Sequence, residues 1–300
     1  MNNGEFSIPL IHNSISIMTP FLLAAIGGLM TELAGMLNIA LEGLILIGAF
    51  FSVIFAASTG SLFFGILFGI MMTVFVSFVF GAITLYLKAN VFITGLATNL
   101  MAGGLTTVLS FYLFGTKGIL IFRELPSLPI FNVPILHGIP VIGDILFGHN
   151  ILVYLGWLIV VVAWIVIYKT PFGYRLRGTG SNPEAMTAIG LKPQNYQMAG
   201  ILISGFTCGL AGAVLTLNLG LYVPYISSGR GWIALVIIIL GGRTPFGILG
   251  AAFLFGLAES LSNYAQGFMD IPADFILAFP YIITVAVIVI LSMIQQRKSA

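Results

Sequence analysis

The chain has 300 residues, of which 59% are hydrophobic and only 7% are charged, and its formal net charge is +2. Soluble domains carry about 25% charged residues, so this composition excludes a soluble globular protein. It predicts an all-α, polytopic transmembrane helix bundle in which residues 1–300 form a single domain. A bilayer core takes about 20 apolar residues per helix, which allows about nine spans, within a range of eight to ten.

Nine apolar segments follow one another along the chain. Backbone groups in lipid must pair within their own segment, so each segment is expected to be a helix. Trp232–Leu240 is too short to span a bilayer unaided and is expected to be a half-helix or continuous with its neighbour. The segments are Ile8–Met30, Ala40–Ala57, Leu62–Leu87, Phe92–Phe114, Ile151–Tyr168, Met198–Leu219, Trp232–Leu240, Phe246–Tyr264 and Phe275–Ile294.

The basic residues gather in alternate loops between these segments. Alternation places eight Lys and Arg residues on one side of the membrane and three, Lys117, Arg123 and Arg230, on the other. Short cytoplasmic loops carry the excess of Lys and Arg. We therefore expect the N-terminus outside, the C-terminus in the cytoplasm, an extracytoplasmic loop at residues 115–150 and a cytoplasmic loop at residues 170–197.

Seven polar side chains interrupt the apolar spans, and an ionisable group there costs about 2.5–3.5 kcal/mol. Asn38 and Glu42 are four residues apart, as are Glu259 and Asn263, so each pair shares a helix face. Two interpretations are open: these groups line a hydrophilic translocation path, or they tie helices together by hydrogen bonds. Gly35, Asn38 and Gly43 predict a broken helix at Glu32 and Glu42, and broken helices often form binding sites in transporters. The seven candidates are Glu32, Asn38, Glu42, Asn99, Asn218, Glu259 and Asn263.

The cytoplasmic loop contains a well-delimited short helix near residues 182–190, with Arg175 upstream of it. Asn182 is a good N-cap, Pro183 suits the first helical position and Glu184 complements the helix dipole. Gly190 can adopt the left-handed conformation that ends a helix. One interpretation of this helix is an amphipathic surface helix beside lipid headgroups. The other is a docking element for a cytoplasmic partner, because pushing a rigid helix that is tethered between two spans moves both spans.

The stretch Thr170–Tyr264 resembles the second half of permeases from bacterial ABC importers of the branched-chain amino acid, simple sugar and nucleoside class. In such permeases a coupling helix carries a Glu-Ala pair and a glycine six residues after the Glu. Glu184, Ala185 and Gly190 have this spacing, while Met186 stands where a second alanine is usual. Residues 31–49 and 228–247 resemble the nucleoside-type branch.

The resemblance implies a type II-like ABC importer permease fold in the bacterial cytoplasmic (inner) membrane. It implies three protein partners: a cytoplasmic ABC ATPase, a second permease subunit, identical or homologous, and an extracytoplasmic solute-binding protein. Nucleosides are the favoured solute, with riboflavin or a simple sugar as alternatives. The residues expected to contact the ATPase are Arg175, Asn182, Pro183, Glu184, Ala185 and Gly190.

The chain is not expected to be an enzyme, because it has no Gly-x-x-x-x-Gly-Lys phosphate loop. The alternative class is an ion-coupled secondary transporter with Glu32, Glu42 or Glu259 as its ion site. No cofactor, metal or nucleic acid is expected. The three histidines have no metal-ligand spacing, and Cys208 lies alone in an apolar stretch whose small residues, four apart, predict close helix packing.

Overall fold

A computed structural model describes residues 3–130 and 142–266 of the chain. Its elements in chain order are α1 (Asn3–Leu33), α2 (Leu41–Thr59), α3 (Leu62–Leu85), α4 (Val91–Phe114), β1 (Leu120–Ile121), α5 (Ile142–Leu146), α6 (Ile151–Lys169), α7 (Pro171–Ser181), α8 (Pro183–Ala188), α9 (Pro193–Leu217), β2 (Leu221–Tyr222), α10 (Arg230–Leu240) and α11 (Pro245–Ala265).

Seven helices in the described part of the chain are long and apolar enough to cross a membrane. Eight of the nine predicted apolar segments coincide with helices, and the ninth, Phe275–Ile294, lies outside the described residues. The predicted helical membrane bundle is therefore confirmed in kind, while the count of nine spans stays a prediction.

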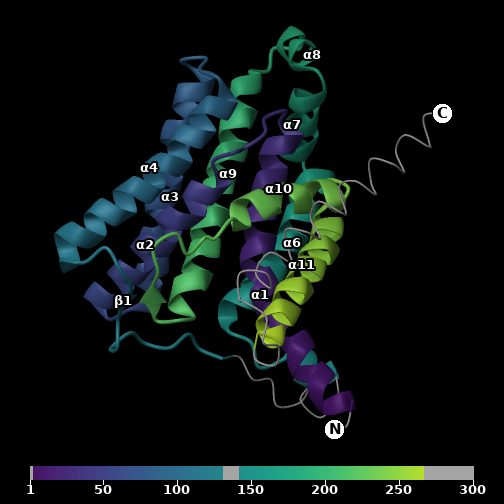
Figure 1. Cartoon of the computed structure of the whole chain (residues 1–300). Coiled ribbons are helices and arrows are strands. Elements are labelled where there is room, and N and C mark those ends of the chain that lie inside the picture. The colour runs from purple at the N-terminus through teal and green to yellow at the C-terminus, as the bar shows by residue number, and fades with distance from the viewer. Residues whose placement is uncertain (1–2, 131–141, 267–300) are drawn as a thin grey trace.

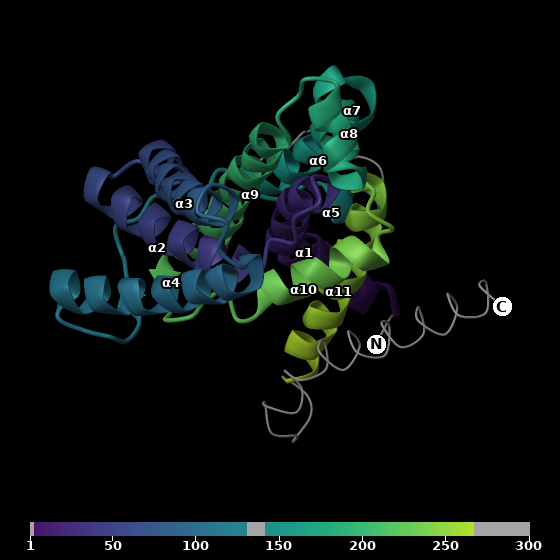
Figure 2. The ribbon, with the colours of Figure 1, turned by 90° about the horizontal axis from the view of Figure 1, so that it is seen from above.

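Helix α9 lies at the centre of the bundle and packs against α1, α2 and α3. Helices α2, α3 and α4 lie on one flank, whereas α6, α10 and α11 lie on the other (Figures 1 and 2). Small residues allow this density: a side chain added at Gly205 would meet Ser77, and one added at Gly209 would meet Ile70. The close packing predicted from these small residues is confirmed.

The two ends of the bundle carry different elements (Figure 1). At one, called the β end here, β1 pairs antiparallel with β2, with Leu120 opposite Tyr222. The other, called the α8 end, carries α7 and α8. The turn between α10 and α11 also lies there, since its Arg243 pairs with Glu32 at the end of α1.

Helix α10 is a half-helix. It has 11 residues, which at 1.5 Å each gives about 16 Å, roughly half of a bilayer core. The chain enters it from β2 through a turn in which Tyr225, Ser228 and Gly229 all have positive φ. Its first residue, Arg230, is half-buried, in contrast to the external loop position expected from charge counting.

Candidate functional site

The connector between α1 and α2, residues 34–40, is irregular and held by side chains from other helices. Asn38 is buried; its amide nitrogen donates to Ser204 Oγ of α9 at 2.8 Å, and its oxygen accepts the Ala40 N–H at 3.0 Å. Backbone that leaves a helix inside the bundle loses its regular partners, and Asn38 replaces one of them.

Asn99 of α4 holds the other end of the same connector. Its oxygen accepts the Gly43 N–H at 2.8 Å, and its nitrogen donates to the Ile39 carbonyl at 2.9 Å. A single amide thus satisfies one donor at the start of α2 and one acceptor just before it. The side chains of Asn38 and Asn99 both form hydrogen bonds that hold this connector to other helices, as expected if these residues tie helices together.

Glu42 joins the start of α2 to the start of α10. Its two carboxylate oxygens accept the N–H groups of Gly229, at 2.8 Å, and Gly231, at 2.7 Å. The N-terminus of a helix has unpaired N–H groups and a positive dipole end, so a carboxylate stabilises it with charge-assisted hydrogen bonds. Gly231 permits the approach, because a Cβ there would overlap the Glu42 backbone.

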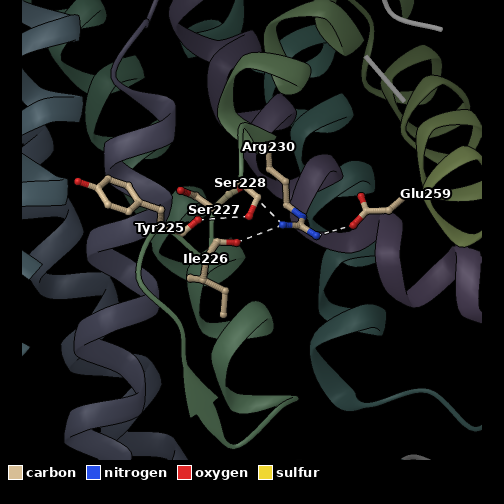
Figure 3. A network of polar contacts seen from close by, with 6 residues as sticks. All are labelled: Tyr225, Ile226, Ser227, Ser228, Arg230 and Glu259. Atoms are coloured by element: carbon tan, nitrogen blue, oxygen red, sulfur yellow. Dashed lines mark hydrogen bonds and ion pairs between the residues drawn. The ribbon is translucent and has the colours of Figure 1, made fainter. Parts of the chain in front are cut away.

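Arg230 and Glu259 form an ion pair between α10 and α11, and each side chain is 18% exposed (Figure 3). The same guanidinium donates to the carbonyls of Ile226, at 3.1 Å, and Ser227, at 3.5 Å. Arg230 therefore ties the turn before α10 to α11, and this role was not anticipated from the sequence. Figure 3 shows Tyr225 directed away from the pair.

Two adjoining cavities lead from the β end to this ion pair. The inner cavity, about 270 Å³, is lined by Asn218, Glu259 and Asn263 together with Arg230. The outer cavity, about 430 Å³, is lined by residues of the β end and shares Ser16, Asn218 and Leu219 with the inner one. Three of the seven predicted path residues, Asn218, Glu259 and Asn263, are thus brought together at one cavity.

Glu32 lies apart from that cavity, at the α8 end. It forms an ion pair with Arg243 at 2.9 Å, and the two side chains are 21% and 61% exposed, respectively. The pair links the end of α1 to the turn between α10 and α11.

The short helix predicted near residues 182–190 is confirmed as α8 (Pro183–Ala188). Asn182 caps it by accepting the Ala185 N–H at 3.0 Å, and Gly190 follows it with φ of 82°. Glu184 and Ala185 are exposed, as is every residue of α8 except Met186. Helix α7 and the first turn of α9, which begins at Pro193, were not predicted from the sequence.

Met186 anchors α8 to α7. It is buried, and a side chain added at Gly178 would meet its sulfur at 2.9 Å. Helix α7 is in turn fixed to α6, because the Arg177 guanidinium lies 4.9 Å from the Tyr168 ring and 5.1 Å from the Tyr174 ring. The residue that departs from the Glu-Ala-Ala pattern is thus the one that seats the helix.

Two histidines lie against each other at the β end. The His12 and His149 rings stack at 3.9 Å, and burial lowers the pKa of His149 to about 4. His149 accepts from or donates to Ser16 Oγ at 3.0 Å and contacts the Ile145 carbonyl at 3.0 Å. Within residues 3–130 and 142–266, no group of three metal-ligating side chains occurs.

A bundle of membrane-length helices that contains a half-helix and a cavity beside an ion pair is typical of membrane transporters. The family described as branched-chain amino acid transport system / permease component matches residues 10–291. The chain therefore belongs to this family of permeases.

Among its relatives, the nucleoside ABC transporter permease protein NupC of Lactococcus lactis is 34% identical, covering 93% of this chain and 90% of that one. The guanosine ABC transporter permease protein NupQ of Bacillus subtilis is also 34% identical, covering 89% and 86%. A putative glucose ABC transporter permease of Haloferax volcanii is 31% identical, covering 87% and 79%.

The fold is also found among solved structures. A chain of PsaBC from Streptococcus pneumoniae, solved in complex with Fab, aligns with a TM-score of 0.52 and covers 95% of this chain and 92% of its own. Its sequence identity is 16%, so this similarity concerns the fold.

Proposed function

We propose that the chain is the membrane-spanning permease subunit of an ABC importer for nucleosides, driven by a separate ATPase. The observation that carries this proposal is its 34% identity, over most of both chains, to permeases named for nucleoside and guanosine transport. The family match over residues 10–291 supports the permease role independently of the solute.

The inner cavity suits an uncharged polar solute. Asn218 and Asn263 offer amide donors and acceptors, while Glu259 offers carboxylate oxygens that accept from hydroxyl groups. The paired Arg230 neutralises this carboxylate. The wall also includes Val214 and Leu215, which give the apolar contact that a nucleobase favours. We assign the solute path to this cavity and assign Asn38, Asn99 and Glu42 to holding the connector.

The ATPase contacts the α8 end. Glu184, Ala185 and Gly190 are exposed there together with Asn182 and Pro183, and Arg175 lies on the neighbouring α7. Ile189, 70% exposed, supplies an apolar contact for a protein partner. This assignment places the α8 end in the cytoplasm and the N-terminus outside. The solute-binding protein then docks at the β end, where residues 115–130 and 142–150 lie, and a second permease subunit completes the transporter.

The test is uptake by the purified complex in liposomes. With its ATPase and binding protein, the complex should take up labelled guanosine only when ATP is supplied, and excess unlabelled nucleoside should compete, while glucose and riboflavin should not. Competition by glucose alone would replace the nucleoside assignment with a sugar. Uptake by the permease alone on an ion gradient would contradict the ABC class altogether.

A matched glycine pair tests the docking role of α8. Gly190 and Gly60 both have positive φ, at 82° and 65°, and in both cases nothing lies within 4 Å of an added side chain. Valine costs about 1–2 kcal/mol of backbone strain at either site. Gly190→Val should uncouple ATP hydrolysis from uptake, whereas Gly60→Val should not. Equal coupling in the two variants would count against α8 as the contact.

A further inference from the structure

The connector touches the coupling loop through two glycines. Gly35, at its start, lies against Gly180 of α7, such that a Cβ on Gly35 would be 3.0 Å from the Gly180 Cα. A Cβ on Gly180 would overlap the Leu33 carbonyl and lie 2.8 Å from the Gly35 nitrogen. Backbone thus meets backbone here. Since both residues are glycines, no flexible side chain lies between the two backbones to absorb a displacement. A displacement of α7 is therefore passed on to the connector, as closely packed interiors transmit strain.

The same connector is fastened along its length. At its start, the Gln197 amide of α9 donates to the Ala34 carbonyl at 3.4 Å. In its middle, Asn38 bonds to Ser204, and at its end Asn99 bonds to Ile39 and Gly43. A segment held at several points moves as one body with the elements that hold it.

At its far end, the connector leads into Glu42, which binds the start of the half-helix α10. The Glu42 carboxylate binds the Gly229 and Gly231 N–H groups, which flank Arg230. Arg230 in turn pairs with Glu259 at the inner cavity. Residues 34–42 therefore contact α7 at one end and, at the other, the two residues on either side of Arg230 at the start of α10.

We propose that residues 34–42 are the linkage that carries movement of the coupling loop to α10, with Gly35–Gly180 as the input contact and Glu42 as the output clamp. The inference rests on the proposed function of α8. When the ATPase displaces α7 and α8, the connector shifts the N-terminus of α10, and the Arg230–Glu259 pair at the inner cavity rearranges. Gly35, Gly180 and Glu42 are positioning residues and do not contact the solute.

Two glycine-to-alanine variants of the assembled transporter test the input contact. Gly180→Ala adds a methyl group that displaces the connector, whereas Gly104→Ala adds one on α4 where nothing lies within 4 Å. The readout is the number of ATP molecules hydrolysed per solute imported. Gly180→Ala should raise this ratio by about fivefold or more, the lower end of usual coupling between sites, and Gly104→Ala should leave it unchanged. An unchanged ratio in an assembled Gly180→Ala complex would overturn the proposal, because a merely structural defect lowers both rates together.

Amide hydrogen exchange follows the output directly. Binding of a non-hydrolysable ATP analogue to the wild-type complex should change exchange of the Gly229 and Gly231 amides, and Gly180→Ala should abolish that change. The same response in Gly180→Ala and wild type would refute the linkage. If Gly180→Ala does not assemble, Glu42→Gln tests the other end: it replaces one acceptor by a donor facing an N–H, and should also raise the ATP-to-solute ratio, whereas an unchanged ratio would refute the clamp.

Failure of this inference is distinguishable from failure of the proposed function. If the permease is not ATP-driven, the wild-type complex itself will show no ATP-dependent uptake. If only the linkage is wrong, wild type will couple normally, Gly190→Val will uncouple, and Gly180→Ala will behave as wild type.

Discussion

Replacing Asn99 by alanine decides between the two interpretations of the polar groups within the spans. The substitution removes the acceptor of the Gly43 N–H and the donor to the Ile39 carbonyl, which are bonded at 2.8 and 2.9 Å. Leaving a buried polar backbone group unpaired costs about 1–3 kcal/mol. With two groups affected, and the site half-buried, we expect Asn99→Ala to lower the free energy of unfolding by about 2–4 kcal/mol.

The matched control is Asn90→Ala, at the asparagine that caps α4. Asn90 caps this helix by accepting the N–H groups of Phe92 and Ile93 at 2.9 and 3.1 Å, in an exposed position. Loss of such a cap costs about 1 kcal/mol. Unfolding in mixed micelles of increasing SDS content, followed by the fluorescence of the three tryptophans, measures both variants. If Asn99→Ala is no less stable than Asn90→Ala but has lost uptake, Asn99 lines the path and the helix-tying account is wrong.

Three further variants test other parts of the account. Glu259→Gln leaves the half-buried Arg230 without its carboxylate and should lower both the unfolding temperature and uptake. The double variant Arg230→Met, Glu259→Gln should recover part of the lost stability. Strictly additive losses would show that the two charges do not interact. Burial holds the pKa of His149 at about 4, below its ordinary 6.5. The contribution of neutral His149 to the stability of the fold is therefore complete above pH 6.5 and is lost as the pH falls toward 4. His149→Asn should make the unfolding temperature decline less over that pH range, and a decline identical to that of wild type would contradict this role of His149. Met186→Ala removes the side chain that packs against Gly178. The variant should reduce ATP-coupled uptake while most of the protein still folds, since α8 lies at the edge of the bundle. Full coupling in this variant would show that α8 does not need this anchoring contact.

The helices that the sequence predicted best are those whose causes are local. An apolar run of membrane length is visible in the sequence itself, and α8 is delimited by Asn182, Pro183 and Gly190, whose effects reach only a few residues. Helix α7 was missed because its sequence, PFGYRLRGTGS, has three glycines and a weak helix propensity. It is fixed instead by its Thr170 cap and by the packing of Arg177 between two tyrosine rings.

The sequence identified several residues of the candidate site but not the partners to which they bond. Glu42 and Glu259 were identified because carboxylates are rare in apolar spans, yet their partners lie far along the chain. Glu42 binds residues 187 and 189 positions away, and Glu259 pairs with Arg230, 29 positions away. Arg230 was assigned to a loop because the apolar run begins only at Trp232, whereas α10 begins at Arg230 itself. Only tertiary structure distinguishes a path residue from a cap in such cases.

The side of the membrane on which α8 lies tests the central claim most directly, because an ATPase reaches only the cytoplasmic face. The chain has one cysteine, Cys208, which is buried, so Glu184→Cys introduces a single exposed thiol. In intact cells an impermeant maleimide should fail to label this thiol, and in inverted membrane vesicles it should label it fully. Labelling in intact cells would place α8 outside and contradict the account.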